Sequence, residues 1–396
     1  MTSKFLAPAL LSLVAAAALV ACGGGGGDGG SATPVTPTAD AVTTASAATA
    51  TSIGATVIAG ASSDEEVYNL AADVGDSWQL VLNNKTSQYV IKVLKSQYNL
   101  NSSTAATFTK TTVGTVTTVK DASGSALSVQ IDTRTKTVAG NVTVGSKTAT
   151  VSGSGYAIAD VGKLAGNYFF AGSTHNVSNG QWRDTPLGGF IIAANGTDIT
   201  VCDGSIAVNG VCTAVSASSP VISSKALKIV KDGALLRIMD GTKDFGVLNV
   251  SAGDRGPVLI IDRFGLNDDT PAILRAGVFY GAKSAKLAGT EFDGNWTCSS
   301  GGADLGTLVV SGTAYTVTAN KVSQQGVLQY NKAYVARTNS TADVNGILIA
   351  KNNNEALGEA SLVLPLSSSL AILVDSPAAD STQLGTDKNI NVCRKV

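Results

Sequence analysis

Residues 78–93 read WQLVLNNKTSQYVIKV, and this stretch decides the fold class. Its apolar side chains first recur at every second position, at Trp78, Leu80 and Leu82, with Gln79 on the opposite face. The polar segment 83–85 predicts a turn, after which the alternation resumes up to residue 93. A period of two is the period of a half-buried β-strand. The stretch therefore predicts two strands on either side of a turn.

The same pattern continues towards the C-terminus. Residues 128–151 are rich in Val and Thr with regular polar alternation, and Asp232-Gly233 separates two apolar segments, 226–230 and 234–239, as in a short hairpin. The continuous apolar run Val258–Ile261 predicts a strand that is buried on both faces. Because no helical period extends beyond two turns, we expect an all-β body.

Three short sequence echoes occur twice in the same order. KLAG at 163–166 returns at 286–289, LGGFII at 187–192 resembles LGTLVV at 305–310, and GVL at 246–248 resembles GIL at 346–348. The three tryptophans, at positions 78, 182 and 296, are also spread along the chain. We therefore expect related β-modules at 159–285 and 286–396 and a divergent one at 63–158. Each module has the size of an antiparallel β-barrel or β-sandwich.

Composition excludes several classes of function. The chain has 396 residues, 44% of them hydrophobic and 14% charged, with a net charge of −1. It therefore lacks the excess of positive charge that nucleic-acid binding requires. Its 43 glycines and two methionines suit a turn-rich, strand-rich exported protein.

The N-terminus has the features of an export signal. Lys4 precedes an apolar run, 5–20, which is too short for a comfortable membrane span, so residues 1–21 are expected to be a secretory signal peptide. The run ends in Leu19-Val20-Ala21-Cys22, which resembles the lipobox of bacterial lipoproteins. The resemblance implies cleavage before Cys22 and attachment of fatty acids, such as palmitate, to this residue. Since Gly23 follows instead of Asp, it also implies an outer-membrane location, with the face of that membrane left open.

Residues 22–62 are expected to form a lipidated flexible tether. The glycine run 23–27 and its neighbours contain a formal GxGxxG, but no strand precedes it and no helix follows, which excludes a dinucleotide site. Residues 31–62 are rich in Ala, Thr, Ser and Pro and contain no aromatic residue, which is typical of a linker. The whole tether, with about 40 flexible residues, would have a reach of roughly 35 Å. A glycine run behind a lipidated cysteine also resembles Neisseria-type surface lipoproteins, such as the transferrin-binding and factor H-binding ones. This resemblance covers the tether alone.

Four cysteines remain besides Cys22, and an even number in an exported chain favours disulfides. Three pairings are possible. The economical one joins Cys202 to Cys212 across the turn-forming Asn209-Gly210, and Cys298 to Cys393, which would link the first and last strands of a module. The alternative is a metal site, but CxxC spacing is absent.

Catalytic motifs are missing from the sequence. GxSxG and HExxH are absent, and His175 is the single histidine. Its segment, 172–176, is typical of a polar loop, so we expect an exposed histidine and no catalytic residue, cofactor or metal site. Carboxylates remain: Asp64-Glu65-Glu66 is interpreted as a solvated cluster and Asp268-Asp269 as a turn cap beside Pro271, with weak calcium binding as the alternative.

Aromatic groups offer candidate binding surfaces, although core positions are favoured. Tyr168-Phe169-Phe170 and Phe279-Tyr280 are adjacent on strands, so at least one member of each set should point into the core. Tyr330 and Tyr334 share a face with Lys332 and are interpreted either as a ligand-facing stripe or as sheet surface.

These features favour a non-enzymatic lipoprotein, anchored in the outer membrane through its lipid, that binds a partner through β-sheet faces or loops. One alternative is a β-barrel carrier of a small apolar ligand or lipid. Another is a structural or adhesive envelope component. The sequence does not identify the protein or small-molecule partner.

Overall fold

The structure of this chain is a computed structural model. It describes residues 39–180, 182–184, 187–216, 223–266, 273–300, 303–319, 321–335, 339–354, 356–357, 360–374 and 390–396. The expected signal peptide, the expected lipidation site Cys22 and the glycine run lie outside the described residues.

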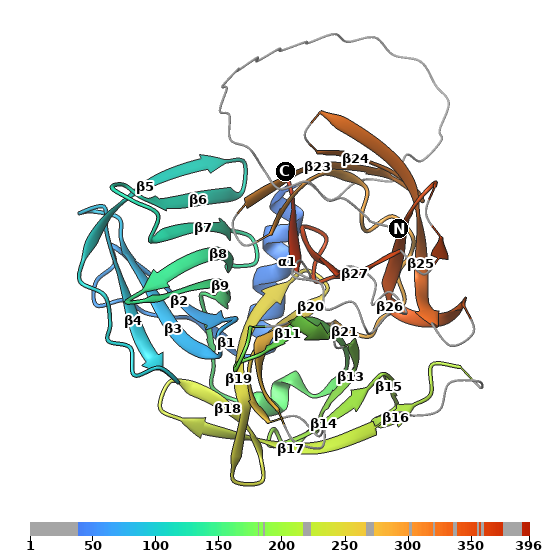
Figure 1. The fold of residues 1–396 in the computed structure, drawn as a ribbon, viewed down its shortest axis with the longest axis horizontal. Helices are drawn as coiled ribbons and strands as arrows, with labels where there is room; N and C mark the ends of the chain where they lie inside the picture. Colours follow the sequence, from blue (N-terminus) through green and yellow to red (C-terminus); the bar gives the residue numbers. More distant parts are fainter. Residues whose placement is uncertain are drawn as a thin grey trace. The chain divides into compact units, whose positions relative to one another are not determined.

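The first barrel is a closed antiparallel meander of eight strands in sequence order, drawn in blue to green in Figure 1. The strand β9 pairs with β2 and completes the ring. The alternation in residues 78–93 folds as predicted, because β3 and β4 pair on either side of a turn at 84–87. The strands are β2 (Glu65–Ala72), β3 (Asp76–Asn83), β4 (Gln88–Lys95), β5 (Ala106–Val113), β6 (Val116–Asp121), β7 (Leu127–Asp132), β8 (Thr137–Val144) and β9 (Lys147–Ser154).

The second barrel closes because β21 pairs with β11, the first strand of its ring. β12 (Trp182–Asp184) adds to β11 outside the ring, and β15 (Ile206–Val208) and β16 (Val211–Thr213) form a separate hairpin. The strands of the ring are β11 (Gly166–Asn176), β13 (Leu187–Ile192), β14 (Asp198–Asp203), β17 (Ser223–Asp232), β18 (Leu235–Asp240), β19 (Lys243–Gly253), β20 (Gly256–Leu266) and β21 (Leu274–Lys283).

The third barrel is again a closed meander of eight strands, and β29 pairs with β22 to complete it. Its strands are β22 (Gly294–Ser300), β23 (Ala303–Ser311), β24 (Ala314–Ala319), β25 (Val322–Val335), β26 (Ser340–Asn352), β27 (Ser361–Pro365), β28 (Leu370–Val374) and β29 (Asn391–Lys395). The all-β prediction is confirmed, and the choice left open between barrels and sandwiches is resolved in favour of barrels.

Each barrel interior is filled by side chains, and in the second barrel Ile53, Ile158 and Leu164 from outside its strands pack into the same core. An eight-stranded barrel has an interior just wide enough for packed side chains. Trp78 in the first barrel and Trp296 in the third are fully buried, and Tyr168 and Phe190 pack inside the second. The alternation of each strand is therefore explained by a packed interior on one side.

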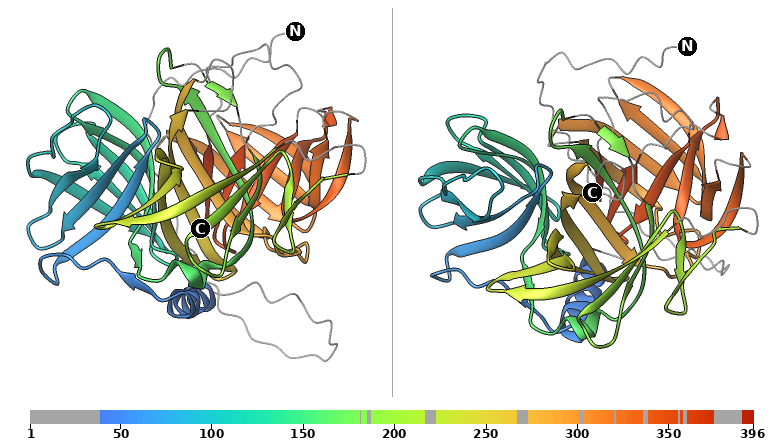
Figure 2. Two further views of the ribbon diagram at one scale, coloured as in Figure 1. Left: turned by 90° about the horizontal axis from the view of Figure 1, so that it is seen from below. Right: turned by 60° about the horizontal axis from the view of Figure 1, so that its bottom comes forward.

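The expectation of a flexible tether throughout 23–62 is wrong for residues 39–57. These residues form α1 (Ala39–Ser52) and β1 (Ala55–Val57), which pairs with β10 (Tyr156–Ile158). Val42, Ser46, Ala50 and Ile53 recur on one helical face and are buried, and α1 packs against β19 (Figure 2). Alanine is the best helix former, and small side chains allow close approach, so a linker-like composition forms a packed helix. A short 3₁₀ helix, η1 (Val161–Leu164), follows β10.

Candidate functional site: the junction of the three barrels

The outer face of β19–β21 in the second barrel is covered by the other two barrels. Val258, Ile260 and Tyr280 belong to a hydrophobic cluster that joins residues of all three barrels. The third barrel contributes ten apolar residues to this cluster, whereas the first contributes Ala71 and Ala139. Barrel 3 is therefore attached mainly by apolar packing, and the attachment of barrel 1 depends more on polar contacts.

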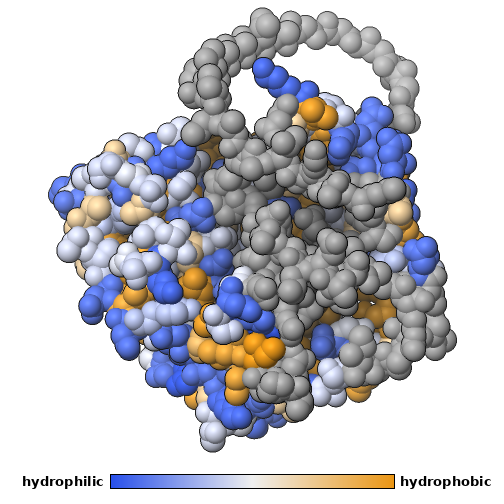
Figure 3. Space-filling model, in the orientation of Figure 1, coloured by the Kyte–Doolittle hydropathy of each residue, from blue (hydrophilic) through white to orange (hydrophobic). Residues whose placement is uncertain are grey.

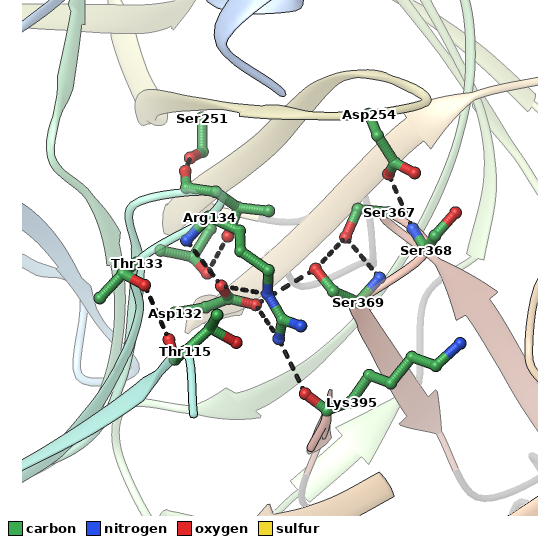
Figure 4. Close-up of polar contacts among 12 residues, drawn as sticks. Thr115, Asp132, Thr133, Arg134, Ser251, Asp254, Ser367, Ser368, Ser369 and Lys395 are labelled. Carbon is green, nitrogen blue, oxygen red and sulfur yellow. Dashed lines mark hydrogen bonds and ion pairs between the residues drawn. The ribbon is translucent and has the colours of Figure 1, made fainter. Parts of the chain in front are cut away.

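A buried ion pair lies at the centre of these polar contacts (Figure 4). Arg134 Nε donates to Asp132 Oδ1 at 2.9 Å and Arg134 Nη2 donates to Asp132 Oδ2 at 3.0 Å, with side chains that are 5% and 0% exposed. Asp132 ends β7, and its carboxylate also accepts the backbone N–H of Arg134 at 2.9 Å, as Asp often does in turns. This local turn presents the guanidinium to the third barrel, where Nη2 donates to the carbonyl oxygen of Lys395 at 2.8 Å.

Serine side chains extend this network into the other barrels. Ser369 of barrel 3 donates to Asp132 Oδ2 at 3.3 Å, and Ser251 of barrel 2 donates to the carbonyl oxygen of Thr135. Asp254 of barrel 2 accepts the backbone N–H of Ser368 at 2.8 Å (Figure 4). We call Asp132, Arg134, Ser251, Ser369 and Lys395 the junction. It brings together groups that lie more than a hundred residues apart in the chain.

A second arginine reinforces the contact between barrels 1 and 3. Arg394 of β29 donates through Nη1 to Gln130 Oε1 at 3.1 Å. Burial lowers the pKa of this guanidinium, and the nearby Asp132 raises it again. The guanidinium donates to the side-chain amide of Gln130 and therefore links β29 of barrel 3 to β7 of barrel 1.

The contact between barrels 1 and 2 contains a buried carboxyl group. Ser77 of β3 donates to Asp262 Oδ2 of β20 at 2.7 Å, and Asp262 is 2% exposed. Sequence reasoning missed Ser77, Asp262, Asp132 and Arg134. No motif marks them, because each partner comes from a distant strand that the fold brings close.

His175 does not lie in the exposed loop that was predicted. It is a half-buried residue of β11, and its neighbour in β21 is Ala276. Burial lowers its pKa. The polar segment 172–176 is strand because it pairs with β21, which the local sequence does not show.

The acidic clusters behave differently from one another. Glu66 accepts from Lys110 Nζ at 2.8 Å and from Asn84 Nδ2 at 2.8 Å, which lowers its pKa despite partial burial, while Asp64 and Glu65 are exposed or half-exposed. Asp268, Asp269 and Pro271 lie outside the described residues. Within the described part of the chain, no group of three or more His, Cys, Asp and Glu is placed to hold a metal ion.

Most of the aromatic candidates belong to cores, and Tyr334 is the exception. Tyr168, Phe170 and Phe279 point into barrel 2, whereas Phe169 and Tyr280 point outwards and are buried between barrels. The stripe of Tyr330 and Tyr334 is interrupted by a register shift at Asn331, which has a φ of 56°. Tyr330 packs against the interior of barrel 3, Tyr334 donates to Asn339 Oδ1 at 3.3 Å, and Lys332 pairs with Asp343 at 2.7 Å.

Both economical disulfides are present in the structure. Cys202–Cys212 joins β14 to the β15–β16 hairpin, and Cys298–Cys393 joins β22 to β29, the first and last strands of barrel 3. The first bridge therefore ties the hairpin to a strand of barrel 2, and the second ties the two ends of barrel 3 together.

The described surface carries scattered apolar residues. The exposed large hydrophobic side chains are mainly single valines such as Val113, Val211 and Val322. Figure 3 shows small hydrophobic groups among hydrophilic ones on the face drawn there, outside the residues in grey. One outer sheet face is free of charge: on β23–β25 it consists of three cross-strand rows, Thr307-Thr318-Ser323, Val309-Thr316-Gln325 and Ser311-Ala314-Val327. We call these nine residues the neutral face.

The helix of the described residues does not have the properties of a membrane span. Within the described residues, no helix has both the length and the apolar character needed to cross a bilayer.

The fold defines an all-β protein built from three closed antiparallel barrels. No family model matches the chain, and no curated protein matches it significantly. Among solved structures it is similar to a mutant of the vaccine antigen transferrin-binding protein B from Haemophilus parasuis Hp5, with a TM-score of 0.22, 9% identity, and coverage of 81% of this chain and 66% of that one. A double mutant of the same antigen gives a TM-score of 0.20 at 8% identity, with coverage of 80% and 64%.

Intact Ap-TbpB, with its N and C lobes, gives a TM-score of 0.19 at 9% identity, with coverage of 81% and 66%. This chain thus spans slightly less than two thirds of the length of these proteins. Scores this low assign neither a family nor a ligand.

Proposed function

We propose that this chain is a lipid-anchored protein of the bacterial outer membrane that binds a protein partner through the outside of its barrels, without catalysis. The packed barrel interiors support this proposal most directly. Trp78 and Trp296 are fully buried among the apolar side chains of their own barrels. A carrier of a small apolar ligand needs a lined cavity, so the packing disfavours that alternative.

The neutral face is the surface that we propose for partner binding. Seven of its nine residues are exposed, Thr316 and Thr318 being half-exposed, and none is charged. The centres of protein–protein interfaces are depleted in charged residues, because a charge buried on binding loses its hydration. A face of threonine, serine, glutamine and valine offers both hydrogen bonds and apolar contact to a protein surface.

Anchoring is proposed from the lipobox and is tested separately. Cys22→Ser should move the protein from the detergent phase to the aqueous phase, or leave the signal peptide uncleaved, because the fatty acids are lost. Unchanged partitioning of the variant would contradict the anchor.

Adjacent residues on one strand provide a matched test of partner binding. A photo-activated cross-linking residue is placed at Thr316, on the neutral face, or at Val317, whose side chain packs against the interior of barrel 3. We expect a discrete protein adduct in intact cells from position 316 and none from position 317. A barrel carrier predicts the reverse preference and a small molecule that remains bound in native mass spectrometry. Such a molecule, with no adduct at 316, would contradict the proposed function.

A further inference from the structure

Barrels 1 and 2 meet at a buried carboxyl group that has one hydrogen-bond partner. Asp262 Oδ2 accepts from Ser77 Oγ at 2.7 Å. Among the described residues, no donor lies within hydrogen-bonding distance of Oδ1. An ionised carboxylate buried with an unsatisfied oxygen is strongly unfavourable, whereas a protonated carboxyl group can remain buried at much lower cost.

The charged groups that face Asp262 do not neutralise it. Asp73 and Asp76 come from the β2–β3 region of barrel 1, and their negative charges oppose ionisation of Asp262. Burial raises the pKa of Asp73 itself to about 7, so Asp73 adds its charge mainly above that pH. Lys95 of β4 is the opposing cation, but its Nζ binds Asp244 Oδ2 at 3.1 Å. The fixed partners of Asp76 are Trp78 Nε1 at 3.2 Å and the backbone N–H of Gln97 at 2.7 Å. The environment therefore favours the neutral form of Asp262.

The direction of the pH effect follows from these contacts. Burial raises the pKa of Asp262 well above its usual value, and Asp76 and Asp73 raise it further, against the opposing effects of Ser77 and Lys95. When barrel 1 separates from barrel 2, the carboxyl group becomes hydrated and its pKa returns to near 4. Between these two pKa values the closed form binds one proton more than the open form. Raising the pH in this interval therefore favours opening.

We propose that the Ser77–Asp262 contact is a pH-sensitive latch, which holds barrel 1 against barrel 2 when Asp262 is protonated and releases it when Asp262 ionises. Barrel 1 is the part that moves, because it adds only Ala71 and Ala139 to the shared apolar cluster. Barrel 3 adds ten apolar residues and stays attached to barrel 2.

Spin labels on the full-length protein in detergent test the latch. One pair joins exposed positions of barrels 1 and 2, Thr111 and Lys231, and a control pair joins barrels 2 and 3, Lys231 and Gln325. Distance distributions are recorded by pulsed electron paramagnetic resonance between about pH 5 and about pH 9, a range that lies above the ordinary pKa of a hydrated aspartate. We expect a second, longer distance for the first pair as the pH rises, with an open-to-closed ratio that increases up to about tenfold per pH unit. The control pair should not change.

Three variants separate the latch from a merely structural role. Asp262→Asn cannot ionise, so the first pair should stay closed at every pH; an unchanged pH response, or opening at every pH, would overturn the proposal. Asp73→Asn removes a negative charge that raises the pKa of Asp262 in the closed form, so the open fraction at high pH should fall while the onset of opening stays at the same pH. Should Asp262→Asn fail to fold, Ser77→Ala decides: it removes a hydrogen bond that exists only in the closed form, so opening must begin at lower pH and must still depend on pH. An unchanged onset of opening, or a wild-type distribution that is constant with pH, refutes the latch.

Discussion

At the scale of single residues, Trp296 shows what a barrel interior contributes. It is fully buried, its ring stacks on Phe292 at 4.4 Å between centroids, and its Nε1 donates to the carbonyl oxygen of Phe292 at 2.7 Å. Trp296→Ala should lower the free energy of unfolding by about 3–5 kcal/mol through lost contacts and a cavity. Denaturant titration measures this loss. Val322→Ala, at an exposed site, should change it by less than about 0.5 kcal/mol.

The sequence predicts which side chains of a strand point into the barrel and which point outwards. It does not predict what covers the outward-pointing side chains. The alternation around Trp78 and Leu80 correctly places these residues in the interior. Phe169 and Tyr280 point outwards, as their positions next to inward residues require, and are nevertheless buried. Their burial comes from a neighbouring barrel, and no local pattern encodes which outward face another barrel covers.

At the scale of elements, α1 should behave as part of the folded body. Its buried face, which includes Val42 and Ala50, rests on the second barrel. Limited proteolysis should leave a resistant fragment that begins no later than Ala39, and Ala50→Asp should move that start towards residue 63 because it buries an unpaired charge. A wild-type fragment that begins near Ser63 would contradict the packing of α1. The sequence could not reveal this helix, since its partner strand β19 lies about 200 residues away in the chain.

The Cys298–Cys393 bridge is the second element-scale feature that can be tested. It joins the two ends of barrel 3 across a sequence separation of 95 residues. In the loop-entropy model such a bridge stabilises the folded state by about 4–5 kcal/mol. Cys298→Ser/Cys393→Ser, which leaves no free thiol, should lower the melting temperature of barrel 3. The matched variant Cys202→Ser/Cys212→Ser removes a bridge that closes a far shorter loop, so it should cost about 3 kcal/mol or less. Equal effects of the two would contradict the loop-length argument.

At the scale of the whole molecule, sequence reasoning gives the type of module but not the contacts between modules. Alternation and hairpin signals were enough for antiparallel all-β modules, whereas the choice between barrels and sandwiches came from the structure. The polar residues that join the barrels are separated by long stretches of chain: 185 residues for Ser77 and Asp262, and 261 for Arg134 and Lys395. A serine or an arginine at such a position has the same local pattern as any exposed residue. The candidate site therefore follows from the assembled fold.

The ion pair at the junction gives a prediction for the assembled molecule. Arg134→Met leaves Asp132 buried without its cation and should lower the free energy of unfolding by about 3–5 kcal/mol. Asp132→Leu/Arg134→Met removes both charges, so it should recover most of this loss, because two apolar side chains replace two desolvated ions. The control Lys332→Met breaks the exposed pair with Asp343 and should cost less than about 1 kcal/mol. Denaturant titration of the wild type, the single variants Asp132→Leu and Arg134→Met, and the double variant gives the coupling energy. A double variant as unstable as the sum of its single variants would show that Asp132 and Arg134 act independently, and that the hydrogen bonds to Ser369 and Lys395, not the ion pair, hold barrel 1 to barrel 3.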